Sequence, residues 1–217
     1  MVYKLPKGTQ DSPTGRGFAY LDGKNPTWTI SSEPIESPTS AVGYTIGQVY
    51  GNKDIFYAMY NDEDPVTGKT TSSRGHIKGV VGFDDKTGFW IQHSAPKYPP
   101  ADKYDYPETA TKFGQTMICM SMKTSDLGDI GEFPELEPLI VKKKSLTTAE
   151  AKQSTTSVKD LKTIGGYSFT SFSKHTKFDA DLWGDLIAQV EKVPLVVESW
   201  LNGGAKDLES VCEPTKT

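Results

Sequence analysis

Cysteine and histidine are both scarce in this sequence of 217 residues. The two cysteines, Cys119 and Cys212, cannot form a disulfide framework or a cysteine-rich zinc site. The three histidines, His76, His93 and His175, leave few candidates for acid–base or nucleophilic chemistry near neutral pH. No apolar run approaches the ~20 residues that a transmembrane helix needs, so we expect neither a membrane protein nor a membrane partner.

Positive charge is also in short supply. The chain has 24 Lys and Arg against 28 Asp and Glu, and its net charge of −4 does not favour an approach to nucleic acid at neutral pH. Protonation of all three histidines in acid would bring the net charge to about −1. Residues 1–6 contain neither a basic region nor an apolar core of the signal-peptide type, so we expect no export signal in this sequence.

Apolar periodicity and turn residues predict a mixed α/β fold. Ser37 followed by Pro38 is typical of a helix start, and the spacing predicts a helix to about Tyr50. Residues 55–60 form an apolar run that is typical of a buried strand. Two further runs, separated by turn residues 84–88, predict a hairpin, and another strand is expected after it. The expected hairpin strands are residues 75–83 and 89–93, and the later strand is residues 115–122.

The second part of the chain repeats the element order of the first. Residues 142–163 contain no aromatic residue and are rich in Lys, Ser, Thr and Ala, which is typical of a linker. A helix is predicted at 179–190 and a strand at 194–200, matching the earlier helix and buried strand. We therefore divide the chain into a complete first half (1–141), a linker-like segment (142–163) and an incomplete second repeat (164–217).

One pair of residues has a spacing suited to phosphate chemistry. His76 and Lys78 fall on the same face of a predicted strand because side chains alternate along it. An imidazole can attack phosphorus or move a proton, and an ammonium can neutralise phosphate oxygens. Two polar residues on a solvated strand face are the simpler interpretation of the same tripeptide. Gly75 and Gly79 flank the pair and would allow close approach of a backbone.

Longer strings around this pair resemble the deoxyribonuclease II family, and the resemblance extends over the whole chain. The strings that carry it are Val2-Tyr3-Lys4-Leu5-Pro6, Ser40-Ala41-Val42-Gly43, Tyr60-Asn61-Asp62, Arg74-Gly75-His76-Ile77-Lys78-Gly79-Val80, the segment 88–100, Gly114-Gln115-Thr116 with Cys119, Glu132-Phe133-Pro134, Ser171-Phe172-Ser173-Lys174 and Asp181-Leu182-Trp183.

The resemblance implies an acid endonuclease of the phospholipase D superfamily that is lysosomal or secreted and acts on DNA without a metal or other cofactor. It implies a sheet flanked by helices, and two pseudo-repeats that each present a His-x-Lys pair to one cleft. One histidine would form a phosphohistidine and the other would protonate the leaving 5′-oxygen, which leaves 3′-phosphate ends. The matching positions assign His76 and Lys78 as catalytic, with Arg74 and His93 as supporting residues. A packed strand histidine is the alternative for His93.

This sequence also departs from the family pattern. The family's second His-x-Lys pair corresponds to a point beyond Thr217, and the partners expected for Cys119 and Cys212 likewise fall outside the sequence. His175 and Lys177 have the right spacing, but the resemblance places them in a non-catalytic segment before a helix. We expect a solvated turn there, with a second catalytic pair as the alternative.

Three functional interpretations follow from these departures. In the first, two copies of the chain form a homodimer that pools two His-x-Lys pairs into an acid deoxyribonuclease. In the second, the chain is a non-catalytic, secreted deoxyribonuclease II-like protein that binds a partner. In the third, the sequence is a fragment of an active enzyme. We expect weak or no cleavage of DNA by an isolated monomer, because one catalytic histidine has no substitute.

Overall fold

A computed structural model describes residues 1–63, 77–130, 156–174 and 178–197 of the chain. Its main feature is a seven-stranded sheet in the order β3-β2-β1-β7-β6-β5-β4, in which all neighbours are antiparallel. The strands are β1 Val2–Lys4, β2 Phe18–Tyr20, β3 Thr29–Ile30, β4 Phe56–Tyr60, β5 Gly79–Phe83, β6 Thr87–His93 and β7 Gln115–Lys123. A separate hairpin consists of β8 Ser157–Lys162 and β9 Ser168–Ser173. The mixed α/β class predicted from the sequence is confirmed.

The predicted hairpin around residues 84–88 is confirmed as β5 and β6, but β5 begins at Gly79, so Ile77 and Lys78 precede the strand that was expected from residue 75. Every residue of β5 is buried, which agrees with its unbroken run of apolar and glycine residues. Asp84 closes the turn, because its carboxylate accepts hydrogen bonds from the backbone amides of Lys86 and Thr87, each at 2.7 Å. Gly79 packs tightly, since a side chain there would collide with the Tyr60 hydroxyl and the Ile91 carbonyl. Its role in the structure is therefore close sheet packing.

The first helix begins later than the sequence predicted. It consists of α1 Ala41–Ile46 followed by a 3₁₀ turn, η1 Gly47–Val49. Ser40, and not Ser37, caps it, because the Ser40 hydroxyl accepts a hydrogen bond from the Gly43 amide at 2.9 Å. The predicted apolar face is confirmed: Val42, Ile46 and Val49 are all buried.

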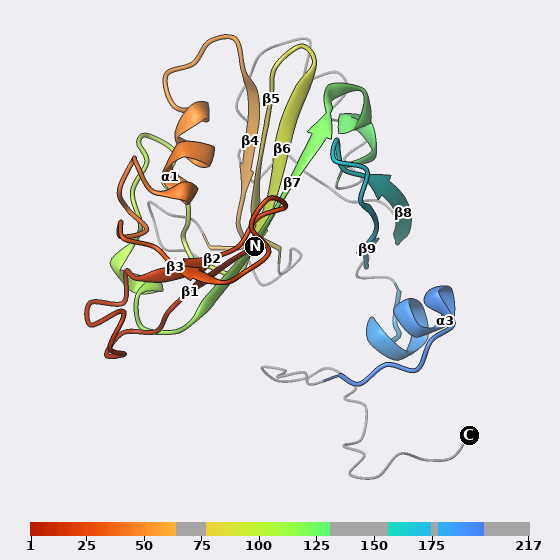
Figure 1. Ribbon diagram of the computed structural model, residues 1–217. Helices are drawn as coiled ribbons and strands as arrows, with labels where there is room; N and C mark the ends of the chain where they lie inside the picture. Colours follow the sequence, from red (N-terminus) through yellow and green to blue (C-terminus); the bar gives the residue numbers. More distant parts are fainter. Residues whose placement is uncertain (64–76, 131–155, 175–177, 198–217) are drawn as a thin grey trace.

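Two apolar cores lie on opposite faces of the sheet, with α1 on one side and the β8–β9 hairpin on the other (Figure 1). The α1-side core includes Phe18, Ile35, Val42, Ile46, Val80, Ile91, Tyr98, Tyr106 and Met117. The hairpin-side core includes Phe56, Val81, Phe83, Trp90, Met122, Leu127 and Leu161. Short 3₁₀ turns, η2 Glu108–Ala110 and η3 Thr124–Asp129, complete this part of the fold.

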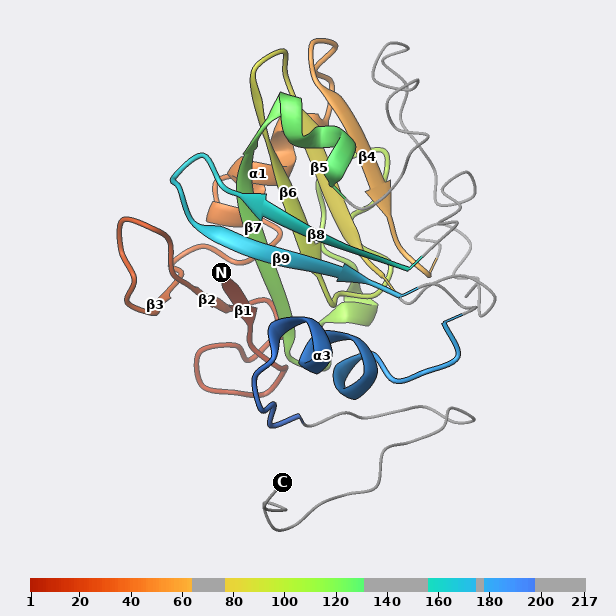
Figure 2. The same cartoon turned by 90° about the vertical axis from the view of Figure 1, so that its right-hand side faces the viewer.

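The hairpin corrects part of the predicted linker. Residues 157–162 form β8, which crosses the face of the sheet together with β9 (Figure 2). Leu161 anchors this strand in the hairpin-side core, and Phe169 of β9 packs against the same core. No strand was expected here, because most side chains of β8 are polar and the strand forms by pairing with β9. The three-part division of the chain stays a prediction.

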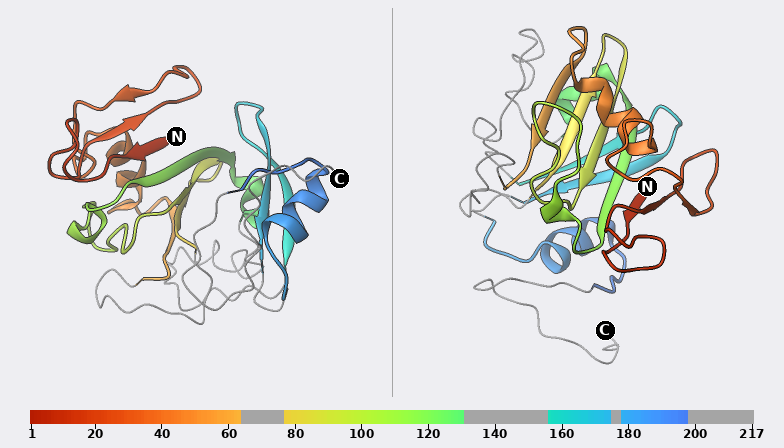
Figure 3. Two further views of the ribbon diagram at one scale, coloured as in Figure 1. Left: turned by 90° about the horizontal axis from the view of Figure 1, so that it is seen from below. Right: turned by 90° about the vertical axis from the view of Figure 1, so that its left-hand side faces the viewer.

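The last helical element of the described residues is short and lies on the outer side of the hairpin (Figure 3). A π-helical turn, η4 Trp183–Ile187, leads into α3 Ala188–Glu191, so the helix predicted at 179–190 is present but starts later. Asp181 caps it by accepting hydrogen bonds from the Trp183 and Gly184 amides. The strand predicted at 194–200 is wrong for residues 194–197, which pair with no described strand. Residues 198–200 lie outside the described residues.

Candidate functional site

Three neighbouring strands bring polar residues together at the lower end of the sheet in Figure 1. Gly79, the first residue of β5, pairs with the last residue of β4 and with the next-to-last residue of β6. Asn61, Lys78 and His93 therefore lie side by side just beyond these pairs. The His93 amide continues the ladder by donating a hydrogen bond to the Lys78 carbonyl at 3.1 Å.

Lys78 forms a buried ion pair with Asp62. The ammonium Nζ contacts the carboxylate Oδ1, and the two residues are only 6% and 8% exposed. Burial of two charges is tolerated when they neutralise each other at short range. Asp62 belongs to the string Tyr60-Asn61-Asp62 that resembles the family, but the sequence alone assigns it no role. The available signal was a carboxylate two residues after a buried strand, with a lysine directly before the next strand.

His93 is packed beside this ion pair. Its ring makes an edge contact with the ring of Tyr98, with 5.3 Å between the centroids. Burial, and then the positive charge of Lys78, lower the pKa of His93 to about 3, although the Ala95 carbonyl and Asp62 act in the opposite direction. The neutral imidazole is therefore the stable form in mild acid. The expectation that all three histidines gain charge in mild acid is wrong for His93.

Asn61 forms hydrogen bonds with the loop of residues 95–98, which covers His93 through Tyr98. Its side-chain amide donates hydrogen bonds to the carbonyls of Ala95, at 3.2 Å, and Tyr98, at 2.9 Å. The Asn61 side-chain oxygen accepts a hydrogen bond from the Glu63 amide at 2.9 Å. Because Asn61 and Asp62 are adjacent, a single turn after β4 holds both the covering loop and Lys78.

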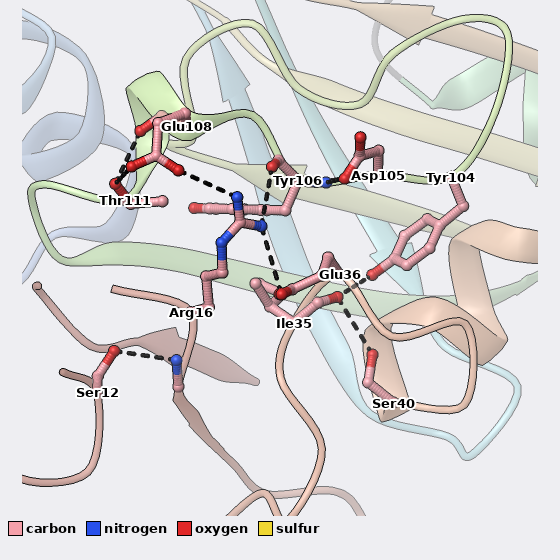
Figure 4. A network of polar contacts seen from close by, with 11 residues as sticks. Ser12, Arg16, Ile35, Glu36, Ser40, Tyr104, Asp105, Tyr106, Glu108 and Thr111 are labelled. Carbon is pink, nitrogen blue, oxygen red and sulfur yellow. Dashed lines mark hydrogen bonds and ion pairs between the residues drawn. The ribbon is translucent and has the colours of Figure 1, made fainter. Parts of the chain in front are cut away.

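A second polar network supports the same loop from farther away (Figure 4). Arg16 contacts the carboxylates of Glu36, at 3.5 Å, and Glu108, at 3.1 Å, and donates a hydrogen bond to the Tyr106 carbonyl. Tyr106 packs against Tyr98, the ring neighbour of His93, with 5.1 Å between centroids. The Arg16 network thus connects the N-terminal loops to the wall of the site.

Several predicted site residues lie outside the described part of the chain. Arg74 and His76 fall within residues 64–76, and His175 and Lys177 fall within residues 175–177. The structure therefore brings together Lys78 and His93 of the predicted set and adds Asp62 and Asn61. The assignments of His76, Arg74, His175 and Lys177 stay predictions, as does the supporting role of His93.

Two cavities lie away from Lys78 and His93. A largely apolar groove of about 1060 Å³ runs between β6, β7, β9 and the C-terminal helix, and Cys119 and Trp183 are among its lining residues. A cavity of about 620 Å³ beside η3 is lined by Asp126, Asp129 and Asp160. Within the described ranges, no group of three or more His, Cys, Asp or Glu residues is arranged to hold a metal ion.

The structure also bears on the expectation that Cys119 has no partner in this sequence and on the expectation that no membrane span is present. Cys119 is a free, exposed thiol, and Cys212 lies outside the described residues. None of the helices in the described segments is long and apolar enough to cross a bilayer.

Comparison with known proteins gives a consistent result over the whole chain. The sequence profile of the family described as Deoxyribonuclease II matches residues 1–149 and 131–217. Cell-death-related nuclease 7 of Caenorhabditis elegans is 39% identical over an alignment of 235 positions, gaps included. The alignment covers 99% of this chain and 64% of that protein.

Two further relatives have similar coverage. Deoxyribonuclease-2 of Caenorhabditis elegans is 33% identical, over 96% of this chain and 68% of that protein. Deoxyribonuclease-2-alpha of Mus musculus is 30% identical, over 93% of this chain and 64% of that protein. The chain thus spans roughly two thirds of the length of these relatives. With a family match along its full length and relatives of this similarity, the chain belongs to the deoxyribonuclease II family.

Proposed function

We propose that this chain hydrolyses phosphodiester bonds of DNA, with His76 as the nucleophile and Lys78 as the group that holds the phosphate oxygens. The observation that carries the proposal is the position of Lys78 directly before β5, beside His93 and two residues after His76. The relatives named as deoxyribonucleases and nucleases support DNA as the substrate. By the same resemblance, we propose a lysosomal or secreted location.

The proposed reaction has two steps. An imidazole nitrogen of His76 attacks phosphorus, the bond from phosphorus to the 5′-oxygen breaks, and a second, protonated histidine gives its proton to that oxygen. Water then attacks the phosphohistidine and loses a proton to the second histidine, which releases a 3′-phosphate end and restores His76. Lys78 stabilises the negative charge on the non-bridging oxygens in both steps.

The second histidine in this scheme comes from a second copy of the chain. His93 is unsuited to the role of a protonated acid, because its pKa of about 3 keeps it neutral in mild acid. A two-fold dimer would place two copies of His76 and Lys78 at one phosphate. His175 is the alternative source within the same chain.

The test is cleavage of supercoiled plasmid in EDTA at about pH 5, where free imidazole side chains carry a proton. The wild-type chain is compared with His76→Ala, Lys78→Gln and His175→Ala, and its mass in solution is measured. Loss of cleavage in His76→Ala and Lys78→Gln but not in His175→Ala, together with a dimer, is the expected result. Equal loss in His76→Ala and His175→Ala would assign the acid to His175.

A second candidate function is favoured by one observation. The ammonium of Lys78 is buried and already neutralised by Asp62, which suits a non-catalytic protein that kept the scaffold to bind a partner. Absence of cleavage by the folded wild-type dimer, with retained affinity for DNA, would support this function over the nuclease.

A further inference from the structure

The ion pair between Lys78 and Asp62 is an unusual feature for the end of a buried strand. Val80 of β5, two residues after Lys78, is fully buried in the α1-side core. The side chains of the ion pair are themselves only 4% and 7% exposed. Buried ion pairs give little net stability, because desolvation offsets most of the attraction between the charges. Stability alone therefore does not explain why a lysine and an aspartate occupy this place.

The charge of Asp62 has a direct consequence for an anion that approaches Lys78. A phosphate oxygen that binds the ammonium also lies close to the Asp62 carboxylate, and two negative charges at such short range repel each other. The carboxylate thus weakens the binding of phosphate while it fixes the direction of the ammonium. Both charges also act on His93: the positive charge of Lys78 lowers the pKa of His93, and the negative charge of Asp62 raises it.

We propose that Asp62 is a positioning residue that orients Lys78 and limits the affinity of the site for phosphate, so that a phosphate-ended product is released. This inference rests on the proposed function, in which Lys78 holds the phosphate. It assigns Asp62 two effects with opposite signs: it speeds turnover through the position of Lys78, and it weakens the binding of anions through its own charge.

The central experiment measures the affinity of the full chain for inorganic phosphate by phosphorus NMR titration, with plasmid cleavage alongside. Asp62→Asn removes the charge and keeps the shape of the side chain. We expect it to bind phosphate about tenfold more tightly, because the repulsion is gone. We also expect kcat and KM for DNA to fall together, as ground-state binding strengthens and the ammonium is less well placed. A purely structural role for Asp62 predicts no gain in affinity.

A matched control is available on the surface. Asp129 pairs with Lys159 at 3.3 Å, and both side chains are about half exposed. Asp129→Asn removes the same charge from the same kind of pair, and should leave phosphate affinity and cleavage at the wild-type level. A second variant, Asp62→Glu, keeps the charge but extends it by one methylene. It should reduce kcat while phosphate affinity stays within about twofold of wild type.

The outcomes separate this inference from the proposed function. If Lys78→Gln binds phosphate and cleaves DNA like the wild type, the proposed function fails at Lys78. If Lys78→Gln loses both properties but Asp62→Asn binds phosphate no more tightly than wild type, only the role of Asp62 is overturned. Absence of phosphate binding in both wild type and Asp62→Asn also overturns it. If Asp62→Asn does not fold, Asp62→Glu decides, and wild-type turnover in that variant would contradict the inference.

Discussion

The part of the chain up to residue 130 and the part from residue 156 onward differ in how they bury apolar side chains. The first part encloses two cores on the two faces of a seven-stranded sheet. In the later described residues, only Leu161 and Leu186 are buried apolar residues, while Val190, Val193 and Val196 are exposed. The first part therefore holds both the stability of the fold and the described site residues, and the later part depends on docking against it.

The largest expected effect tests the core of the first part. Phe83 of β5 is 1% exposed in the hairpin-side core. Phe83→Ala removes a large buried side chain and leaves a cavity, so we expect a loss of about 3–5 kcal/mol in the free energy of unfolding. Urea denaturation followed by tryptophan fluorescence measures this loss. A loss below about 1 kcal/mol would show that this core does not dominate stability.

The next effect concerns His93 and acid. The pKa of His93 is about 3 in the folded chain and near 6.5 when unfolded, so below pH 6.5 the unfolded state takes up its proton first. His93 thus favours folding fully above pH 6.5, and this contribution is lost as the pH falls toward 3. Between pH 7 and pH 3, the free energy of unfolding should therefore fall less in His93→Gln than in the wild type. The difference should be a few kcal/mol, on the order of what such a pKa difference implies.

Denaturation midpoints at several pH values between 3 and 7 check this prediction. Asp129→Asn serves as the control, because it removes one exposed carboxylate that lies away from the site. An acid slope that is the same in His93→Gln and wild type would contradict the buried neutral state of His93.

A smaller effect compares two leucines of the later part. Leu161 of β8 belongs to the hairpin-side core, whereas Leu186 of η4 belongs to neither of the two cores. We expect Leu161→Ala to cost about 2–3 kcal/mol and Leu186→Ala about 1–2 kcal/mol of unfolding free energy. Thermal unfolding of the two variants gives the difference. A larger loss from Leu186→Ala would mean that the helix supports the whole fold.

The smallest effect tests the helix start in the first part. Ser40 is buried and caps α1 through the Gly43 amide. Ser40→Ala should cost about 1 kcal/mol, which is typical of a lost cap. Ser37→Ala is the matched control, since the structure places Ser37 outside the cap. Equal losses in the two variants would restore the helix start that the sequence predicted.

Local patterns predicted the central strands and the apolar face of α1. The run of residues 79–83 is apolar throughout, and Asp84 stands where a turn needs a side-chain acceptor, so both signals come from neighbouring residues. The helix start was placed three residues too early because Ser37 and Ser40 are both suitable caps. Only the contact between Ser40 and Gly43 distinguishes them.

Features that depend on pairing between distant segments were missed. β8 is mostly polar, and only its antiparallel register with β9 makes it a strand. Asp62 and Lys78 meet because β4 and β5 pair with Tyr60 opposite Gly79, and the sequence does not specify this register. The low pKa of His93 likewise arises from burial under the loop that Asn61 holds.

The exposed apolar stretch after α3 has a practical consequence for every assay proposed above. Leu195, Val196 and Val197 follow Pro194 and form a short, uncharged apolar run that pairs with no described strand, and Val196 is fully exposed. Exposed apolar residues promote association between chains, which would mimic a dimer in measurements of mass. Val196→Lys places a charge within this run, which opposes aggregation, and Val196 belongs to neither of the two cores. A two-fold nuclease dimer should survive this substitution, whereas an aggregate should disperse.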